Sequence, residues 1–123
     1  MKNSCKTAKT VGCLCLLILA APLAAFSAEA GESLENGRAA YEMSCAVCHG
    51  ASGKGDIPGV PDFNKKGNSL SKSDQELFQN ILNGYQSPGS FMEMPPKGGN
   101  QDLSEQDIRD IILYLREEFG KKP

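Results

Sequence analysis

The residues with the clearest chemical potential form the segment Cys45-Ala46-Val47-Cys48-His49. Cys45 and Cys48 are three residues apart, so on a helix their thiols lie on one face, and His49 follows on the same side. C-x-x-C-H is the spacing that attaches haem covalently: the two thiols reach the two vinyl groups of the porphyrin, and the imidazole reaches the iron. We therefore predict one covalently attached haem c, with His49 as an iron ligand.

Three other interpretations of this segment are weaker. A structural zinc site requires four ligands, and beyond residue 30 the chain offers only these two cysteines and one histidine. A thioredoxin-like redox pair would follow a strand within a βαβ unit, and no such pattern is present. Two unmodified thiols in a core are disfavoured in an oxidising compartment. Haem attachment is the interpretation that fits the residues best.

The second axial ligand decides what a haem can do. His49 is the only histidine, so ligation by two histidines of one chain is excluded. Met43 lies two residues before the motif on the same predicted helix and cannot reach the opposite face, so we assign it to packing. Met92 and Met94 remain, and Pro95 favours Met94 by holding it in an extended conformation. We expect these two methionine side chains, in an extended segment, to point to opposite sides, so that both cannot be ligands at once.

The first thirty residues have the layout of a secretory signal peptide. Three lysines within the first nine residues precede an uncharged run from Val11 to Phe26, and residues 28–30 read Ala-Glu-Ala. Pro22 interrupts that run, which at about sixteen residues is shorter than the ~20 of a membrane-spanning helix. We predict cleavage after Ala30, periplasmic localisation, and a single domain over residues 31–123.

Three segments of this domain have the apolar spacing of helices, and none alternates as a strand would. The first covers residues 34–48, the second 74–83 and the third 105–119; Ser-x-x-Glu and Ser-x-x-Asp sequences predict capping boxes for the last two. We therefore predict an all-α fold of three or more helices with long loops over residues 50–67 and 86–100. The predicted apolar faces are Leu34, Gly37, Tyr41, Cys45 and Cys48; Leu77, Phe78, Ile81 and Leu82; and Ile108, Ile111, Ile112, Leu115 and Phe119.

The charge of the predicted domain argues against one class of partner. Residues 31–123 contain ten Lys and Arg and fourteen Asp and Glu, and the basic residues are scattered. A nucleic-acid-binding protein would present a basic patch, so we expect no nucleic-acid partner.

A wider pattern surrounds the C-A-V-C-H-G segment. Gly37 and Tyr41 precede it on the first helix, a Met-Pro loop follows, and Tyr114 lies on the last helix. With these features the chain resembles a class I cytochrome c over nearly all of residues 31–123. The run M-P-P-K-G-G, followed by L-S-E-Q-D-I-R-D-I-I-L-Y-L, is most similar to the bacterial cytochrome c-five subgroup. That subgroup often carries an extra disulfide near this region, which is missing here.

The resemblance implies a small cytochrome c fold wrapped around one haem, with Met94 as the second iron ligand. It also implies that Gly37 faces Tyr114 where the first and last helices cross closely. The carbonyl group of Pro61 is expected to orient His49, although the glycine that usually precedes this proline is replaced by valine.

The function that the resemblance implies is one-electron transfer between a donor and an acceptor redox protein, without turnover of a substrate and without membrane insertion after cleavage. Two alternatives stay open on the residues alone. The chain could be a haem subunit of a larger oxidoreductase, or a ligand-binding haem enzyme or sensor if the methionine ligand is labile. A stable methionine–iron bond favours the carrier, because it keeps other ligands from the iron.

Overall fold

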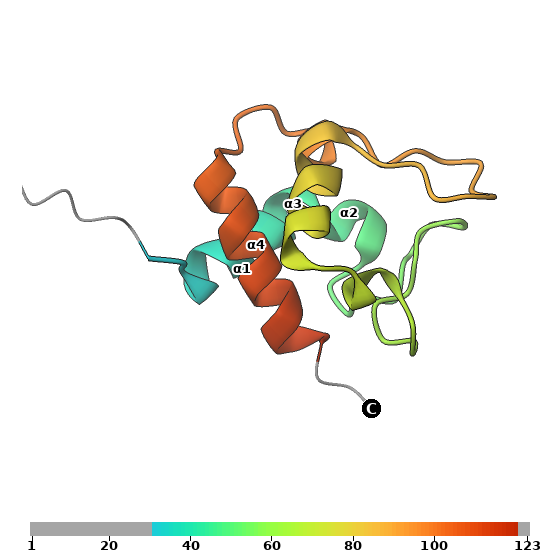
Figure 1. Cartoon of the computed structure of the whole chain (residues 1–123), viewed down its shortest axis with the longest axis horizontal. Coiled ribbons are helices and arrows are strands. Elements are labelled where there is room, and N and C mark those ends of the chain that lie inside the picture. The colour runs from blue at the N-terminus through green and yellow to red at the C-terminus, as the bar shows by residue number, and fades with distance from the viewer. Residues whose placement is uncertain (1–30, 121–123) are drawn as a thin grey trace, which may run out of the picture.

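The computed structural model describes residues 31–120, which fold into helices joined by loops (Figure 1). The elements in chain order are α1 (Leu34–Ser44), α2 (Ala46–His49), the short 3-10 helix η1 (Ser69–Ser71), α3 (Asp74–Asn83), the 3-10 segment η2 (Pro96–Gly99) and α4 (Glu105–Glu118). Residues 31–120 contain no strand, so the all-α prediction is confirmed. The predicted signal peptide, residues 1–30, lies outside the described residues.

The two later helices begin where their capping sequences predict. The Ser73 hydroxyl accepts a hydrogen bond from the Glu76 N–H, and the Glu76 carboxylate accepts one from the Ser73 N–H, which closes a capping box at the start of α3. Ser104 and Asp107 make the same reciprocal pair at the start of α4. The predicted apolar face of α4 is confirmed, because Ile108, Ile111, Ile112, Leu115 and Phe119 are all buried.

The predicted first helix is divided at Cys45 into α1 and α2. Cys45 has φ −110° and ψ −36°, which departs from regular helix geometry, although its carbonyl still accepts a hydrogen bond from the His49 N–H at 3.0 Å. Two expectations for this segment are wrong. Leu34 is 47% exposed, so the predicted apolar face does not extend to the start of α1, and Met43 is 76% exposed and does not pack in the core.

Helices α1 and α4 cross at Gly37 (Figure 1). An ideal Cβ on Gly37 would lie 1.9 Å from the carbonyl oxygen and 2.4 Å from the carbonyl carbon of Asp110, so only glycine permits this approach. The close crossing is confirmed, but Gly37 faces the backbone at Asp110 and not Tyr114. Tyr114 lies one turn further along α4 and packs on Tyr41, with ring centroids 5.3 Å apart.

The side chain of Asp110 reinforces the same crossing. Its buried carboxylate accepts hydrogen bonds from the backbone N–H of Ser33 at 2.9 Å and from the side-chain amide of Asn36 at 2.6 Å. Both donors lie at the start of α1, and the Ser33 N–H is one of the backbone groups that a helix N-terminus leaves without a partner inside the helix. Backbone and side chain of one residue therefore hold α1 against α4.

The close crossing predicts how a methyl group added at Gly37 would change the stability of the protein. In an open helix, Gly37→Ala would stabilise the protein by about 1 kcal/mol, because alanine is the better helix former. Here we expect a net loss of about 1–3 kcal/mol in the free energy of unfolding, since the added Cβ would force the two helices apart. Guanidinium denaturation of the purified protein measures this change.

Gly31→Ala is the matched control, because a Cβ at Gly31 would meet no atom within 4 Å. Its denaturation midpoint is expected to match that of the wild type. An equal or higher midpoint for Gly37→Ala would contradict the close crossing.

Candidate functional site

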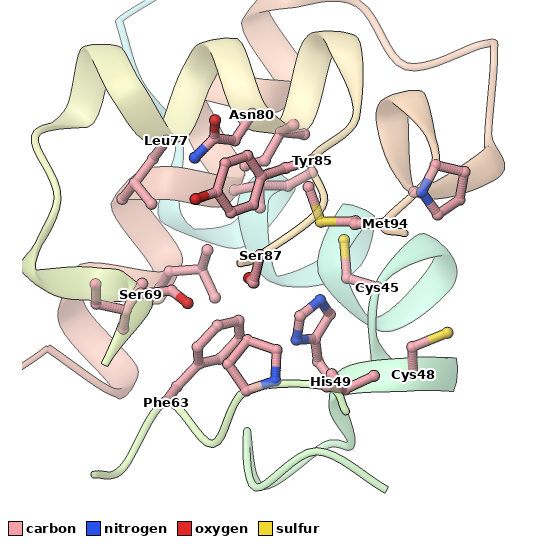
Figure 2. A pocket seen from close by; sticks show the side chains of 18 of the residues that line it. Cys45, Cys48, His49, Phe63, Ser69, Leu77, Asn80, Tyr85, Ser87 and Met94 are labelled. Carbon is pink, nitrogen blue, oxygen red and sulfur yellow. The ribbon is translucent and has the colours of Figure 1, made fainter. Parts of the chain in front are cut away.

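A cavity of about 140 Å³ lies between α1–α2, the loop around Pro61, α3 and the segment that leads into η2 (Figure 2). Apolar side chains such as Leu70, Leu77 and Ile81 form much of its wall. All five residues that the sequence predicts for the cofactor site line this one cavity: Cys45, Cys48, His49, Pro61 and Met94.

Backbone hydrogen bonds fix the segment that carries the cysteines and His49. The loop after α2 folds back on it, so that the N–H of Gly55 donates to the carbonyl of His49 at 2.9 Å and the N–H of Asp56 donates to the carbonyl of Cys48 at 3.0 Å. The buried hydroxyl of Tyr41 on α1 donates to the carbonyl of Gly50 at 2.7 Å. The backbone around His49 is therefore held from both sides.

The imidazole of His49 is in the neutral form at ordinary pH. Burial lowers its pKa to about 4, and its ring stacks on Phe63 with centroids 4.7 Å apart and planes 13° apart. Its Nδ1 atom is buried and has no hydrogen-bond partner. A neutral, oriented imidazole in an apolar site is suited to binding a metal.

Pro61 lies in the expected place but does not make the expected contact. The hydrogen bond between His49 and the carbonyl of Pro61 is not formed in this structure, because Nδ1 of His49 has no partner. The orienting role of Pro61 therefore stays a prediction. The contact that orients the ring here is the stack on Phe63, a residue that no sequence pattern indicated beyond its apolar type.

The two cysteines are unpaired and partly buried. Burial, together with the neighbouring thiol of Cys48, raises the pKa of the Cys45 thiol to about 11. A redox-active Cys-x-x-Cys pair needs the opposite shift, toward a stable thiolate. Within residues 31–120 no group of three or more His, Cys, Asp and Glu side chains is arranged to hold a metal ion, so the zinc alternative gains no support.

Met94 is held by its backbone on both sides. Its N–H donates to the carbonyl of Tyr85 and its carbonyl accepts from the Tyr85 N–H, both at 2.9 Å, which forms an isolated antiparallel bridge. Gly84 permits this approach, since a Cβ there would lie 2.8 Å from the carbonyl oxygen of Met94. Figure 2 shows the sulfur of Met94 and the ring of His49 directed toward each other inside the cavity.

Met92 also lines the cavity, so the expectation that the two methionines point to opposite sides is wrong as a way to separate them. In an extended segment, residues two apart lie on the same face, so the spacing of Met92 and Met94 was no reason to expect opposite directions. Met92 is held by the side chain of Ser90, whose hydroxyl donates to the Met92 carbonyl at 2.8 Å. The backbone bridge, and not side-chain direction, distinguishes Met94.

Two further residues at the cavity were not found from the sequence. Tyr85 follows the glycine that ends α3 and holds Met94, and Lys72 places its ammonium 3.7 Å from the centroid of the Tyr85 ring. Both line the cavity. Neither belongs to a motif or to an apolar helical face, so no sequence pattern indicates that these two residues line the cavity.

The residues present fit a haem. The cavity wall supplies two thiols that can bond to vinyl groups, a neutral buried imidazole, two thioethers and apolar side chains for the faces of the ring. Imidazole and thioether are the ligand pair of iron in electron-transfer haem proteins.

Comparison with known proteins leads to one family. The family model described as Cytochrome c matches residues 34–118. Cytochrome c-555 of Prosthecochloris aestuarii is 32% identical over 84 residues, which cover 67% of this chain and 84% of the relative. Cytochrome c-555 of Chlorobaculum thiosulfatiphilum is 32% identical over 79 residues, which cover 64% of this chain and 88% of the relative.

One solved structure agrees with these relatives. The c-type cytochrome XoxG from Methylobacterium extorquens AM1 matches with a TM-score of 0.56 and 27% sequence identity. The match covers 72% of this chain and 52% of XoxG, so this chain spans about half the length of that protein.

The two thiols on the cavity wall predict a covalent attachment that survives unfolding. After denaturing electrophoresis, haem peroxidase staining is expected to coincide with the protein band. Cys45→Ser or Cys48→Ser should lower the yield of stained protein, because each removes one thioether bond. If acidified organic solvent extracted the haem from denatured wild type, the covalent attachment would be contradicted.

Proposed function

Because the chain belongs to the cytochrome c family, whose members bind covalently attached haem c, we propose that it is a periplasmic one-electron carrier with His49 and Met94 as the axial ligands of its iron. The family accounts for the coarser part of this statement: the protein is a monohaem c-type cytochrome that exchanges electrons with redox partners. The ligand pair and the location are our proposals.

One observation carries the choice of ligands: the bridged Met94 and the stacked His49 face each other inside one apolar cavity. Each is held by contacts that do not depend on the other, since Phe63 orients His49 and Tyr85 holds Met94. Two ligands fixed in this way would keep both axial positions filled, which favours electron transfer over binding of oxygen or peroxide.

The residues around the cavity would support electron transfer by holding the site still and dry. When bound, the haem supplies an iron that accepts and releases one electron. His49 is neutral at ordinary pH and needs no deprotonation before it binds the iron. As an iron ligand, the soft thioether of Met94 would favour the ferrous state and raise the reduction potential. The apolar wall formed by Leu70, Leu77 and Ile81 would exclude water from the ring.

The proposed location rests on the N-terminal sequence. Its basic start, uncharged run and Ala-Glu-Ala segment favour export, and the remaining two cysteines are those of the haem motif. Among the helices of residues 31–120, none combines the length and the apolar content of a membrane span. We propose that the domain works in the periplasm after the first thirty residues are removed.

The choice between the two methionines is testable with a matched pair of variants. Met94→Ala is expected to abolish the methionine–iron charge-transfer band of the oxidised protein, to lower the reduction potential and to let carbon monoxide bind the ferrous iron. Met92→Ala removes a side chain of the same size from the same cavity and is expected to leave the band and the potential nearly unchanged.

The absorption spectrum and a redox titration of both variants measure these effects. Loss of the band in Met92→Ala, with its retention in Met94→Ala, would identify Met92 as the ligand and contradict the proposal. A band unchanged in both variants would mean that neither methionine binds the iron, and the carrier function would lose its main support.

A further inference from the structure

The cavity contains one cation among the described residues that line it, and that cation is Lys72. The one acidic residue in its wall is Glu93, which is exposed. The ammonium of Lys72 lies over the ring of Tyr85, 3.7 Å from its centroid. Ser69 and Asn80 line the same part of the cavity, and Figure 2 shows the Tyr85 hydroxyl directed toward this side and away from Cys48.

The position of Lys72 is fixed by its backbone. Its carbonyl accepts a hydrogen bond from the guanidinium of Arg116 at 2.6 Å, and its N–H donates to the carbonyl of Ser69 at 3.3 Å. Arg116 is itself paired with Asp74, at 2.6 Å. These hydrogen bonds hold the segment before α3 against α4, so the backbone of Lys72 is fixed.

Lys72 forms no salt bridge with another residue of the range 31–120. The salt bridges within residues 31–120 join Arg38 to Glu42, Arg109 to Glu105 and Arg116 to Asp74. Lys72 contributes to lowering the pKa of Glu76, but that carboxylate is bound mainly by Ser73. An ammonium held at the wall of an apolar cavity without a carboxylate partner is matched to an anionic ligand group.

A haem bound in the cavity would carry anionic groups of this kind. Besides the edge that bonds to the cysteines, it carries two propionate side chains, and a carboxylate in an apolar cavity needs a cation or hydrogen-bond donors. We infer that Lys72, positioned by the ring of Tyr85, forms a carboxylate-binding subsite that receives a haem propionate. This inference rests on the proposed placement of the haem in the cavity. Because Tyr85 also holds Met94, the subsite adjoins the proposed ligand segment.

A partnered propionate has a measurable consequence for the iron. A nearby positive charge disfavours the ferric state, and its loss favours that state. We expect Lys72→Gln to lower the ratio of reduced to oxidised protein at a fixed applied potential by roughly threefold to tenfold. The propionate bending band in the resonance Raman spectrum of the holoprotein should shift in the same variant. Lys72→Arg retains the charge and should restore both readouts toward wild type.

Lys66→Gln is the matched control, since Lys66 is exposed, carries the same charge and does not line the cavity. It should leave the Raman band in place and change the ratio less than Lys72→Gln does. Equal Raman spectra and equal ratios for the two glutamine variants would overturn the subsite. That failure is distinguishable from failure of the ligand proposal, which would show as a wild-type protein without the methionine–iron band.

Discussion

The backbone approach of α1 to α4 at Gly37 is the contact on which the cavity depends. It places Tyr41 against α4, where its ring packs on Tyr114 and Phe119 with centroids 5.3 and 5.9 Å away. The hydroxyl of the same tyrosine reaches the carbonyl of Gly50, directly after His49. The side chain of Tyr41 therefore connects the helix crossing to the backbone next to His49, which we propose as an iron ligand.

The opposite wall of the cavity is held by a separate set of contacts. Arg116 binds the carbonyls of Leu70 and Lys72 and the carboxylate of Asp74, which fixes the start of α3 against α4. The bridge between Tyr85 and Met94 then ties the end of α3 to the segment before η2. Both walls therefore converge on α4, and a ring held between them would have little freedom to move. Such rigidity suits a carrier whose ligands stay the same in both oxidation states.

The sequence was informative where chemistry or capping is local. The C-x-x-C-H segment identified three cavity residues, and the capping boxes at Ser73 and Ser104 located α3 and α4. Prediction from the sequence failed where the position of a side chain depends on contacts between residues that are distant in the sequence. The stack of Phe63 on His49 and the position of Lys72 over Tyr85 are set by tertiary packing and leave no periodic pattern. The expectation that Met92 and Met94 point to opposite sides failed for another reason, because residues two apart in an extended segment lie on one face.

In our proposal Met94 binds the haem iron opposite His49. Nuclear magnetic resonance of the ferrous holoprotein, labelled with ¹³C at the methionine methyl groups, tests it most directly. The ring current of the haem shifts the methyl resonance of an axial methionine far upfield of the others. We expect one such resonance, and its sequential assignment should lead to Met94. Assignment of the shifted methyl group to Met92, or the absence of any shifted methyl resonance, would show that Met94 is not the iron ligand.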